Sequence, residues 1–392
     1  MGTTLKSSRL LLTAACLVTM GGRGWSQTSG FSITLTGQSM IRSDIRAHAP
    51  SAVPVIESLL KGDVKFTNFE STVIDETKGQ LRKDGRFLSP PGALESLKAF
   101  GFNLVSLSNN HSFDLKLSGI QNTLEQVNRL KLAHAGIGNT VDEAVAPGYL
   151  KTPKGTVALV AMASGLVPEG GSATATRPGV NELRVEGNKP NEEDSQRILQ
   201  SIREARKKAD LVIVYEHNHV FDKPFQTIML EELPERLGPP DWLKKWTHAE
   251  VDAGVDIVVM HGAPLLHGVE IYHGRPIFFD LGNFIFQAPP SDILLDEPMN
   301  WESVVAYVDF QGKNLQSIKF RPIAQNKIGQ GEPDMHDEHS NNLFLQTRGL
   351  PTPATGEQAH YILQRLADLS RPFGTTVVVN GDSAEIKLKG GN

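Results

Sequence analysis

The chain has one cysteine, Cys16, among its 392 residues, and its basic residues do not outnumber its acidic ones. A single cysteine excludes an intramolecular disulfide and the thiolate clusters that hold structural zinc. There are 39 Lys and Arg residues against 44 Asp and Glu, a formal charge of −5. That balance lacks the basic footprint of a nucleic-acid-binding protein, so we expect no nucleic-acid partner.

The N-terminus has the layout of a secretory signal peptide. Lys6 and Arg9 precede an apolar run over residues 10–20, and small residues follow up to Ser26. The apolar run is too short to span a bilayer comfortably. We therefore predict a signal peptide over residues 1–26 and an exported protein, periplasmic or extracellular.

Cleavage there would change both the cysteine content and the charge. Cys16 lies in the middle of the apolar run rather than at its end, which favours a cleaved peptide over a lipid-anchored protein. The mature chain would lose Lys6, Arg9 and Arg23 but no acidic residue, so its formal charge would fall from −5 to −8. With no cysteine left, any metal must be held by His, Asn, Gln, Asp or Glu side chains.

Strand and helix patterns alternate through residues 31–286, and strand patterns dominate afterwards. This order predicts an α/β fold, with a layered sandwich as the expected architecture. A last helix over residues 356–369 and a hairpin turned at Asn380-Gly381 form a small C-terminal appendage. We divide the chain into the signal peptide, a main domain over residues 27–345 and a helix-plus-hairpin extension over residues 346–392.

Five predicted strands end in small, polar or imidazole-bearing residues. Ligands bind at such strand ends in open α/β folds. A carboxylate, an amide oxygen and two imidazoles suit a divalent zinc, manganese or iron ion with one position open for water. Such an ion lowers the pKa of its water and so supplies a nucleophile near neutral pH. The proposed ligands at these ends are Glu70, Asn110, His217 and His261.

Several segments together resemble the CapA family of bacterial capsule and poly-γ-glutamate proteins. The resemblance covers roughly residues 31–290 in the family's order. It implies a four-layer α/β/β/α sandwich similar to the calcineurin-like metallophosphoesterases, with a metal site. The matching segments are Asn68-Phe69-Glu70, Ser108-Asn109-Asn110-His111 with Asp114, Gly136-Ile137-Gly138, Arg177-Pro178-Gly179-Val180 and Gly268-Val269-Glu270 through Leu281-Gly282-Asn283-Phe284.

The resemblance also implies roles, and the chain departs from the family's pattern at two of them. The first-motif Asp of the family falls on Gln38, and the last His of the fifth motif falls on Pro264. In related two-metal enzymes, that Asp and that His bind the same metal. The ligands of the second metal are all present in this chain, as Glu70, Asn110, His217 and His261. We therefore expect one ion, or a strongly weakened second site. His219 and His267 match no motif position and could restore a ligand only in part.

We assign the remaining site residues as follows. His111 would protonate a leaving group or hydrogen-bond the developing charge. Asp114 would orient His111 or cap the next helix. Substrate contacts are assigned to Gln38, Arg177, His219 and His267.

The function we favour is an exported metal-dependent hydrolase of CapA type, acting on an amide or a phosphoester. Its substrate would be polyanionic or derived from an amino acid, and membrane-associated capsule machinery is a possible partner. One alternative is a non-catalytic polymer-binding or assembly subunit on a degenerate metallophosphatase fold. Another is a lyase or cyclase acting on a small amino-acid derivative. The sequence specifies neither the bond cleaved nor the oligomeric state.

Overall fold

The computed structural model describes residues 1–2, 30–80, 87–224, 227, 238–290, 295–333 and 342–388. Except for residues 1–2, the expected signal peptide lies outside this described part. Within it, no helix combines the length and the apolar character needed to cross a membrane.

Within the described residues, the larger of two main sheets has nine strands. The strands β1, β3, β6 and β7 run parallel to one another, whereas β19 and β20 form a long antiparallel hairpin beside β1. In spatial order the strands are β22 (Val377–Asn380), β23 (Ser383–Ile386), β20 (Asn314–Gln325), β19 (Glu302–Gln311), β1 (Gly30–Leu35), β3 (Val64–Asn68), β6 (Leu104–Ser106) and β7 (Ala133–Ala135), with β21 (Pro351–Pro353) beside β20.

The second main sheet has six strands and a parallel centre. Every residue of β14 and β15 is buried, as expected for parallel strands that are covered on both faces. In spatial order the strands are β16 (Val269–Tyr272), β17 (Arg275–Phe278), β15 (Ile257–His261), β14 (Leu211–Asn218), β10 (Gly155–Ser164) and β9 (Gly148–Thr152).

The two sheets pack face to face, and helices cover their outer faces. Between the sheets lies one apolar core, in which Phe66 of β3 meets Tyr215 of β14 with ring centroids 5.6 Å apart. The helices outside the first sheet are α2 (Val53–Leu59), α3 (Pro91–Phe100) and α4 (Lys116–Arg129). Those outside the second are α6 (Glu192–Lys208) and α8 (Asp241–Ala253). The expected four-layer α/β/β/α order of a metallophosphatase-like fold is confirmed.

Local sequence signals set the ends of these helices. The Asn191 side chain caps α6 by accepting a hydrogen bond from the Asp194 backbone N–H. Acidic residues fill the first turn of α6 and basic residues its last turn, which complements the helix dipole. Helix α3 starts at Pro91 and stops at Gly101, which adopts a left-handed conformation with φ of 104°.

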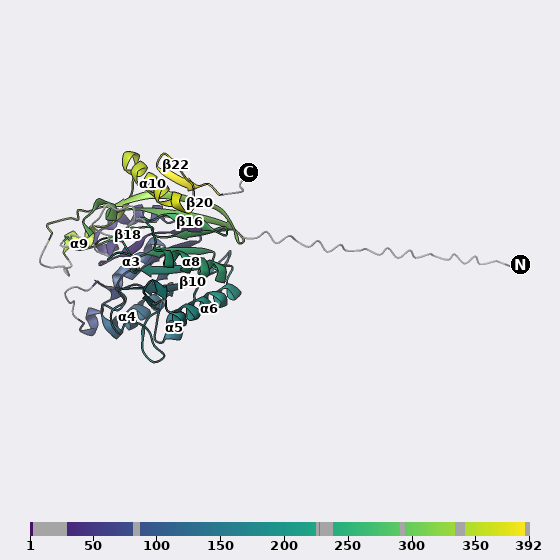
Figure 1. The fold of residues 1–392 in the computed structure, drawn as a ribbon, viewed down its shortest axis with the longest axis horizontal. Helices are drawn as coiled ribbons and strands as arrows, with labels where there is room; N and C mark the ends of the chain where they lie inside the picture. The colour runs from purple at the N-terminus through teal and green to yellow at the C-terminus, as the bar shows by residue number, and fades with distance from the viewer. Residues whose placement is uncertain are drawn as a thin grey trace.

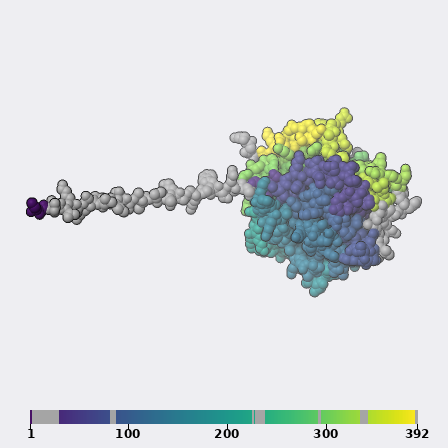
Figure 2. Space-filling model, turned by 180° about the vertical axis from the view of Figure 1, so that it is seen from behind, coloured from purple at the N-terminus to yellow at the C-terminus, as the bar shows by residue number. Residues whose placement is uncertain are grey.

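The C-terminal helix and hairpin extend the first sheet. Strand β23 pairs antiparallel with β20, and β22 pairs with β23. Helix α10 (Gly356–Ser370) buries Ala359, Ile362 and Leu363 in the core between the sheets. Figure 1 shows α10 and β22 on one side of the molecule and α4, α5 (Val141–Val145) and α6 on the opposite side. In Figure 2, seen from behind, the C-terminal segment forms one border of a face built largely from the first half of the chain.

Short elements complete the edge at which the parallel strands end. Strand β2 (Gln38–Met40) follows β1 and pairs with β18 (Asn283–Phe286). Gly37 makes this junction possible, because a Cβ atom there would stand 2.2 Å from the carbonyl oxygen of Gly282. The Gln38 side chain is thereby placed beside Asn283. The other described elements are α1 (Ile45–His48), β4 (Thr72–Val73), β5 (Leu88–Ser89), β8 (Ile137–Gly138), β11 (Gly179–Val180), β12 (Val185–Glu186), β13 (Lys189–Pro190), α9 (Leu343–Thr347) and the 3-10 turns η1 (Pro50–Ala52), η2 (Glu76–Lys78), η5 (Pro298–Trp301) and η6 (Arg371–Phe373).

Candidate metal centre

The carboxyl ends of strands from both sheets meet at one edge of the sandwich. His217 and His261 are partners in the parallel register of β14 and β15, so their backbones lie side by side. Glu70 follows β3 by two residues, and Asn110 follows β6 by four. The four residues that the sequence suggested as ligands thus come from four neighbouring strand ends.

His217 is the centre of the observed contacts. Its Nε2 atom lies 2.9 Å from Asn110 Oδ1 and 3.6 Å from Glu70 Oε1. On the other side of the ring, Nδ1 lies 3.1 Å from the Tyr215 hydroxyl, which fixes the ring orientation. Ligand atoms about 2.1 Å from one ion are separated by roughly 3.0 Å in an octahedral shell and 3.4 Å in a tetrahedral one. The spacing of these three donors is close to those separations.

Two of the proposed ligands carry buried polar atoms without a hydrogen-bond partner in the described structure. They are both ring nitrogens of His261 and Oε2 of Glu70. His261 is 2% exposed and Glu70 is 3% exposed, so water does not cover these atoms. Buried polar groups are nearly always paired, and a bound ion is one of the standard explanations for exceptions. The donor set therefore fits a divalent cation in chemistry.

The arrangement of the proposed ligands fits a metal ion less well than their chemistry does. No group of three or more His, Cys, Asp and Glu side chains in the described ranges is arranged to hold an ion. The spacing argument rests on the amide of Asn110, which is outside those residue types. The His261 ring lies against Tyr215, with centroids 5.4 Å apart. His261 is therefore beside the cluster, and the three contacting donors are Glu70, Asn110 and His217.

Burial keeps the imidazoles of His217, His219 and His261 neutral. It lowers the pKa of His261 to about 3. Burial, together with the charge of His111, lowers the pKa of His219 to about 3. Burial and the neighbouring imidazoles also hold the pKa of His217 well below its usual value. Neutral rings offer the lone pairs that metal coordination requires.

Burial has the opposite effect on the carboxyl groups. It raises the pKa of Glu70 to about 8; the charge on His111 opposes this rise and that on Asp114 adds to it. The pKa of Asp280 is also raised well above its usual value, by burial and by the charge on Glu70. Asp280 accepts a hydrogen bond from the Gly282 backbone N–H at 2.7 Å. Glu70 and Asp280 are therefore two neighbouring carboxyl groups whose ionisation is disfavoured. A bound cation would stabilise their ionised forms.

His111 and Asp114 form a pair at the border of the cluster. Nδ1 of His111 lies 3.0 Å from Oδ2 of Asp114, which also accepts the Phe87 backbone N–H at 2.6 Å. Burial of His111 disfavours its charged form, but the Asp114 carboxylate outweighs that effect and the pKa of His111 is raised. Helix α4 begins at Lys116 without a side-chain cap. Of the two roles considered for Asp114, the contacts therefore show orientation of His111 rather than helix capping.

The four residues assigned to substrate lie in different surroundings. Nε2 of His219 is 3.1 Å from Nε2 of His217, so His219 belongs to the cluster. Gln38 donates from Nε2 to Asn283 Oδ1 at 3.1 Å, while its own Oε1 has no partner within the described structure. The backbone N–H of His267 bonds to the carbonyl of Asp280. Arg177 bonds to the Ser172 carbonyl of its own loop, and no described contact joins it to the proposed ligands.

Sequence reasoning missed two arginines near this edge. The Arg42 guanidinium lies 3.9 Å above the Phe87 ring, and that ring is 5.5 Å from the His111 ring. Arg348 is 3% exposed and stacks over Trp301 at 4.5 Å, while its Nε and Nη1 atoms have no hydrogen-bond partner in the described ranges. Neither arginine lies in a recognisable motif.

A hydrogen-bond network connects the segments that carry these arginines. The Gln287 side chain accepts the backbone N–H of Arg42 at 2.5 Å and donates to the carbonyl of Gln346 at 2.7 Å. Gln346 belongs to α9, which ends one residue before Arg348. Phe87 and Trp301 share one apolar cluster with Phe286. The two guanidinium groups thus flank the same small aromatic cluster beside His111.

Comparison with known proteins identifies relatives of this chain. One, described as uncharacterized protein y4sH of Sinorhizobium fredii, is 27% identical over 94% of this chain and 95% of its own length. The PGA biosynthesis protein CapA of Bacillus subtilis is 27% identical over 61% of this chain and 57% of its own length. The capsule biosynthesis protein CapA of Bacillus anthracis is 27% identical over 68% of this chain and 61% of its own length. Residues 32–288 match the family described as bacterial capsule synthesis protein PGA_cap. That match covers more than half of the chain, which therefore belongs to the PGA_cap family of bacterial capsule synthesis proteins and confirms the resemblance found in its sequence.

Proposed function

We propose that this protein is an exported, divalent-metal-dependent hydrolase that acts on an amide of γ-glutamyl type or on a phosphoester during capsule or poly-glutamate biosynthesis. The observation that carries the proposal is the placement of His217 Nε2 within 2.9 Å of Asn110 Oδ1 and 3.6 Å of Glu70 Oε1. It is supported by both ring nitrogens of His261 and by Oε2 of Glu70, which lack a hydrogen-bond partner among the described residues.

The proposed ligands are Glu70, Asn110, His217 and His261. A divalent ion held there would polarise the scissile group and make water a nucleophile near neutral pH. His217 is oriented for this task by the Tyr215 hydroxyl, and its low pKa keeps its lone pair available. His219, whose Nε2 atom lies 3.1 Å from His217 Nε2, would contact a bound substrate or help to hold the ion.

His111 is the proposed proton donor to the leaving group. Asp114 binds its Nδ1 atom, which leaves Nε2 to carry the proton that is transferred. The raised pKa of His111 favours the protonated ring that this role requires. Asp114 thus acts through His111 as a positioning residue.

Arg42 and Arg348 are the proposed contacts for a negatively charged substrate. The relatives named for poly-glutamate and capsule synthesis make a polymer rich in carboxylates a suitable candidate. A guanidinium group binds a carboxylate or a phosphate through two parallel hydrogen bonds. Among the described residues, Nε and Nη1 of Arg348 lack hydrogen-bond partners, so each could donate a hydrogen bond to an anionic group. Such local positive charge would overcome the net negative charge of the chain.

Metal content tests the proposal most directly. The protein would be purified without chelator, in parallel with a Glu70→Ala variant, and each would be analysed for bound transition metals. About one metal per chain, lost in the variant, supports the proposal. A His111→Ala variant should then keep its metal and lose turnover of amide or phosphoester substrates. Loss of metal and turnover together would contradict the role given to His111.

Export is tested separately, by the mass of the protein recovered outside the cytoplasm. A mature chain that begins near residue 27 supports the proposal. A chain that retains residues 1–26 in the cytoplasm contradicts it.

A second candidate is a non-catalytic polymer-binding or assembly subunit. It is favoured by the presence of Gln38 and Pro264 where the family pattern has metal-binding residues. Absence of bound metal after incubation with zinc or manganese, combined with retained binding of poly-glutamate, would favour this candidate over the hydrolase.

A further inference from the structure

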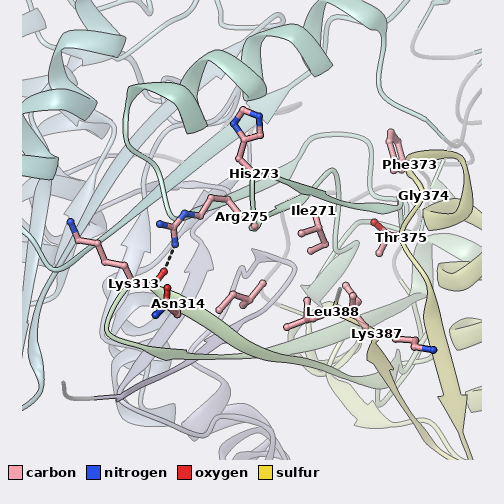
Figure 3. Close-up of a pocket in the computed structure, with 13 residues that line it drawn as sticks. Ile271, His273, Arg275, Lys313, Asn314, Phe373, Gly374, Thr375, Lys387 and Leu388 are labelled. Atoms are coloured by element: carbon pink, nitrogen blue, oxygen red, sulfur yellow. Dashed lines mark hydrogen bonds between the residues drawn. The ribbon is translucent and has the colours of Figure 1, made fainter. Parts of the chain in front are cut away.

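The two ends of the sandwich differ in how their polar side chains are arranged. A cavity of about 500 Å³ lies at the end where β17 begins, away from the edge at which the parallel strand β15 ends in His261 (Figure 3). Its lysines, Lys313 and Lys387, point away from each other in this view. Arg275, also in the cavity wall, is paired with Asp256 at 3.1 Å. The basic groups of this wall therefore do not converge on one ligand, whereas buried polar groups do meet at the edge that carries the proposed metal ligands.

At that edge, Asn109 is fully buried and its amide has partners on two separate segments of the chain. Its Nδ2 atom donates to the Phe69 carbonyl at 2.8 Å and to Oδ1 of Asn68 at 3.2 Å. Its Oδ1 atom accepts the backbone N–H of His111 at 3.1 Å. One side chain therefore joins the end of β3 to the loop that follows β6.

The partners of this amide determine its orientation. The Phe69 carbonyl can only accept a hydrogen bond, and the backbone N–H of His111 can only donate one. A turned amide would place oxygen against oxygen on one side and hydrogen against hydrogen on the other. Asn109 therefore supplies a donor and an acceptor at once, which neither alanine nor leucine offers.

The loop after β6 is also tied to itself. The Ser112 hydroxyl accepts the backbone N–H of Asn109 at 3.0 Å and donates to the Leu107 carbonyl at 2.6 Å. These bonds close the loop around one hydroxyl group. A force that acts on the Asn109 side chain therefore acts on the loop as a unit.

The backbone pairing of β3 and β6 ends just before the proposed ligands. The N–H of Phe69 still donates to the Ser106 carbonyl at 2.9 Å, whereas the next N–H, that of Glu70, donates to the Ser39 carbonyl of β2. Beyond the paired strands, the side chain of Asn109 continues the connection between the two segments.

Two of the proposed metal ligands belong to the segments that Asn109 joins. Glu70 directly follows Phe69, and Asn110 directly follows Asn109. Glu70 Oε1 and Asn110 Oδ1 lie 3.6 Å and 2.9 Å from the same atom, Nε2 of His217. The spacing of these two oxygens depends on where the two backbone segments stand, and a functional site requires its groups to be held within about 0.5 Å.

We propose that Asn109 is a positioning residue of the metal centre. Its amide sets the separation of Glu70 and Asn110 and holds the backbone of His111 in a fixed place relative to both. This inference rests on the proposed metal-dependent function, but the hydrogen bonds of Asn109 are a feature of the metal-free protein. Removing groups that orient metal ligands typically weakens metal binding roughly tenfold to a hundredfold.

Asn103 provides a matched control, because it makes the same kind of connection at the other end of the same two strands. Its Nδ2 atom donates to the Asp63 carbonyl at 2.8 Å, and its Oδ1 atom accepts the Lys65 backbone N–H at 2.8 Å. These partners flank the start of β3, and Asn103 directly precedes β6. Loss of the Asn103 amide therefore removes a comparable connection without touching the segments that carry the ligands.

Cobalt(II) titration of the metal-free mature protein, followed by the visible absorption of the bound ion, compares Asn109→Ala and Asn103→Ala with the wild type. Asn109→Ala should bind cobalt at least roughly tenfold more weakly and change its absorption bands. Asn103→Ala should leave both unchanged, although urea denaturation should show that it also loses stability. Asn109→Leu, which fills the space of the amide, should reproduce the loss of affinity because it restores no hydrogen bond.

Two titration results would overturn the proposal. One is an Asn109→Ala protein that binds cobalt as tightly as the wild type with the same absorption bands. The other is an equal loss of affinity in Asn103→Ala, which would show a general effect of stability rather than positioning.

Crystal structures of the metal-free wild type and Asn109→Leu separate this inference from the proposed function. The variant should show the Phe69 carbonyl and the loop after β6 moved apart by about 1 Å, a shift large enough to impair a site. Unchanged positions of Glu70 and Asn110 would overturn the positioning role. A wild type that binds no metal, or a Glu70→Ala variant that keeps it, would contradict the proposed function instead, and the metal-free structures would then decide the role of Asn109 alone.

Discussion

Burial of the Glu70 carboxyl group makes the free energy of unfolding depend on pH. Its pKa in the folded, metal-free protein is about 8 against an ordinary value of 4.5. The pKa of Glu70 is higher in the folded protein than in the unfolded chain. Its contribution to the free energy of unfolding is therefore fully present below pH 4.5 and is lost as the pH rises toward 8. At about 1.4 kcal/mol per pH unit, ionising buried Glu70 costs up to about 5 kcal/mol.

Replacing Glu70 with Gln removes this pH dependence while keeping the shape of the side chain. The advantage of the variant over the wild type should grow by about 2.7 kcal/mol between pH 6 and pH 9.5. Up to about pH 8 the unfolded chain carries an ionised Glu70 while the folded wild type keeps its proton, and this difference destabilises the folded wild type. Urea denaturation of both proteins in the presence of chelator gives the free energies of unfolding. Glu57→Gln, on the exposed face of α2, is the matched control for the Glu-to-Gln change itself. If the stability difference between Glu70→Gln and the wild type did not change with pH, the reasoning would be refuted. Glu70 would then be ionised and hydrated in the folded protein.

Three further predictions concern the same edge. Asp114→Asn should lower the pKa of His111, because the carboxylate that stabilises its charged ring is lost; an unchanged pKa in an NMR titration of the ring would contradict the pairing. Gly262→Ala should destabilise the protein by more than about 2 kcal/mol in urea denaturation, since the new Cβ would stand 1.8 Å from the Asn218 carbonyl oxygen at a φ of 152°. Gly274→Ala, with open space around its Cβ, should cost only about 1 kcal/mol, and equal losses would refute the clash. Zinc or manganese at a hundredfold excess over Kd should stabilise the wild type by about 2.7 kcal/mol in thermal unfolding and leave Glu70→Ala unchanged; equal stabilisation of both would place the metal elsewhere.

Strong local patterns made the main layers predictable from the sequence. An apolar run that ends in histidine marks β14 and β15, and helices such as α6 carry both a cap and a regular apolar face. The turn of the last hairpin was predicted at Asn380-Gly381, and β22 and β23 meet there. The sequence pattern was sufficient to predict these elements because each is long or ends in a turn that requires specific residues.

Short elements and long-range contacts were not predictable in the same way. The pairing of β2 with β18 joins segments of three and four residues, which are too short to show a period, yet it places Gln38 against Asn283. Arg42 reaches the neighbourhood of His111 only through packing on Phe87, a residue 45 positions away. The identity of the candidate ligands followed from their place at strand ends, whereas Arg42 depends on tertiary packing that no local pattern encodes.

The charges at the metal centre argue for one ion rather than two. Among the described residues, Glu70 and Asp280 are the two carboxyl groups whose charges influence each other at this edge, whereas Asp114 is engaged by His111. Two negative charges balance one divalent ion. Two such ions about 4 Å apart would repel each other by about 17 kcal/mol at an effective dielectric constant of 20, and the second would lack a counter-charge. An Asp at position 38 would supply that charge, but Gln38 is neutral and its amide donates to Asn283. We propose that Gln38 and Pro264, which stand where the family pattern has metal-binding residues, both weaken a second ion site, and we expect one ion per chain.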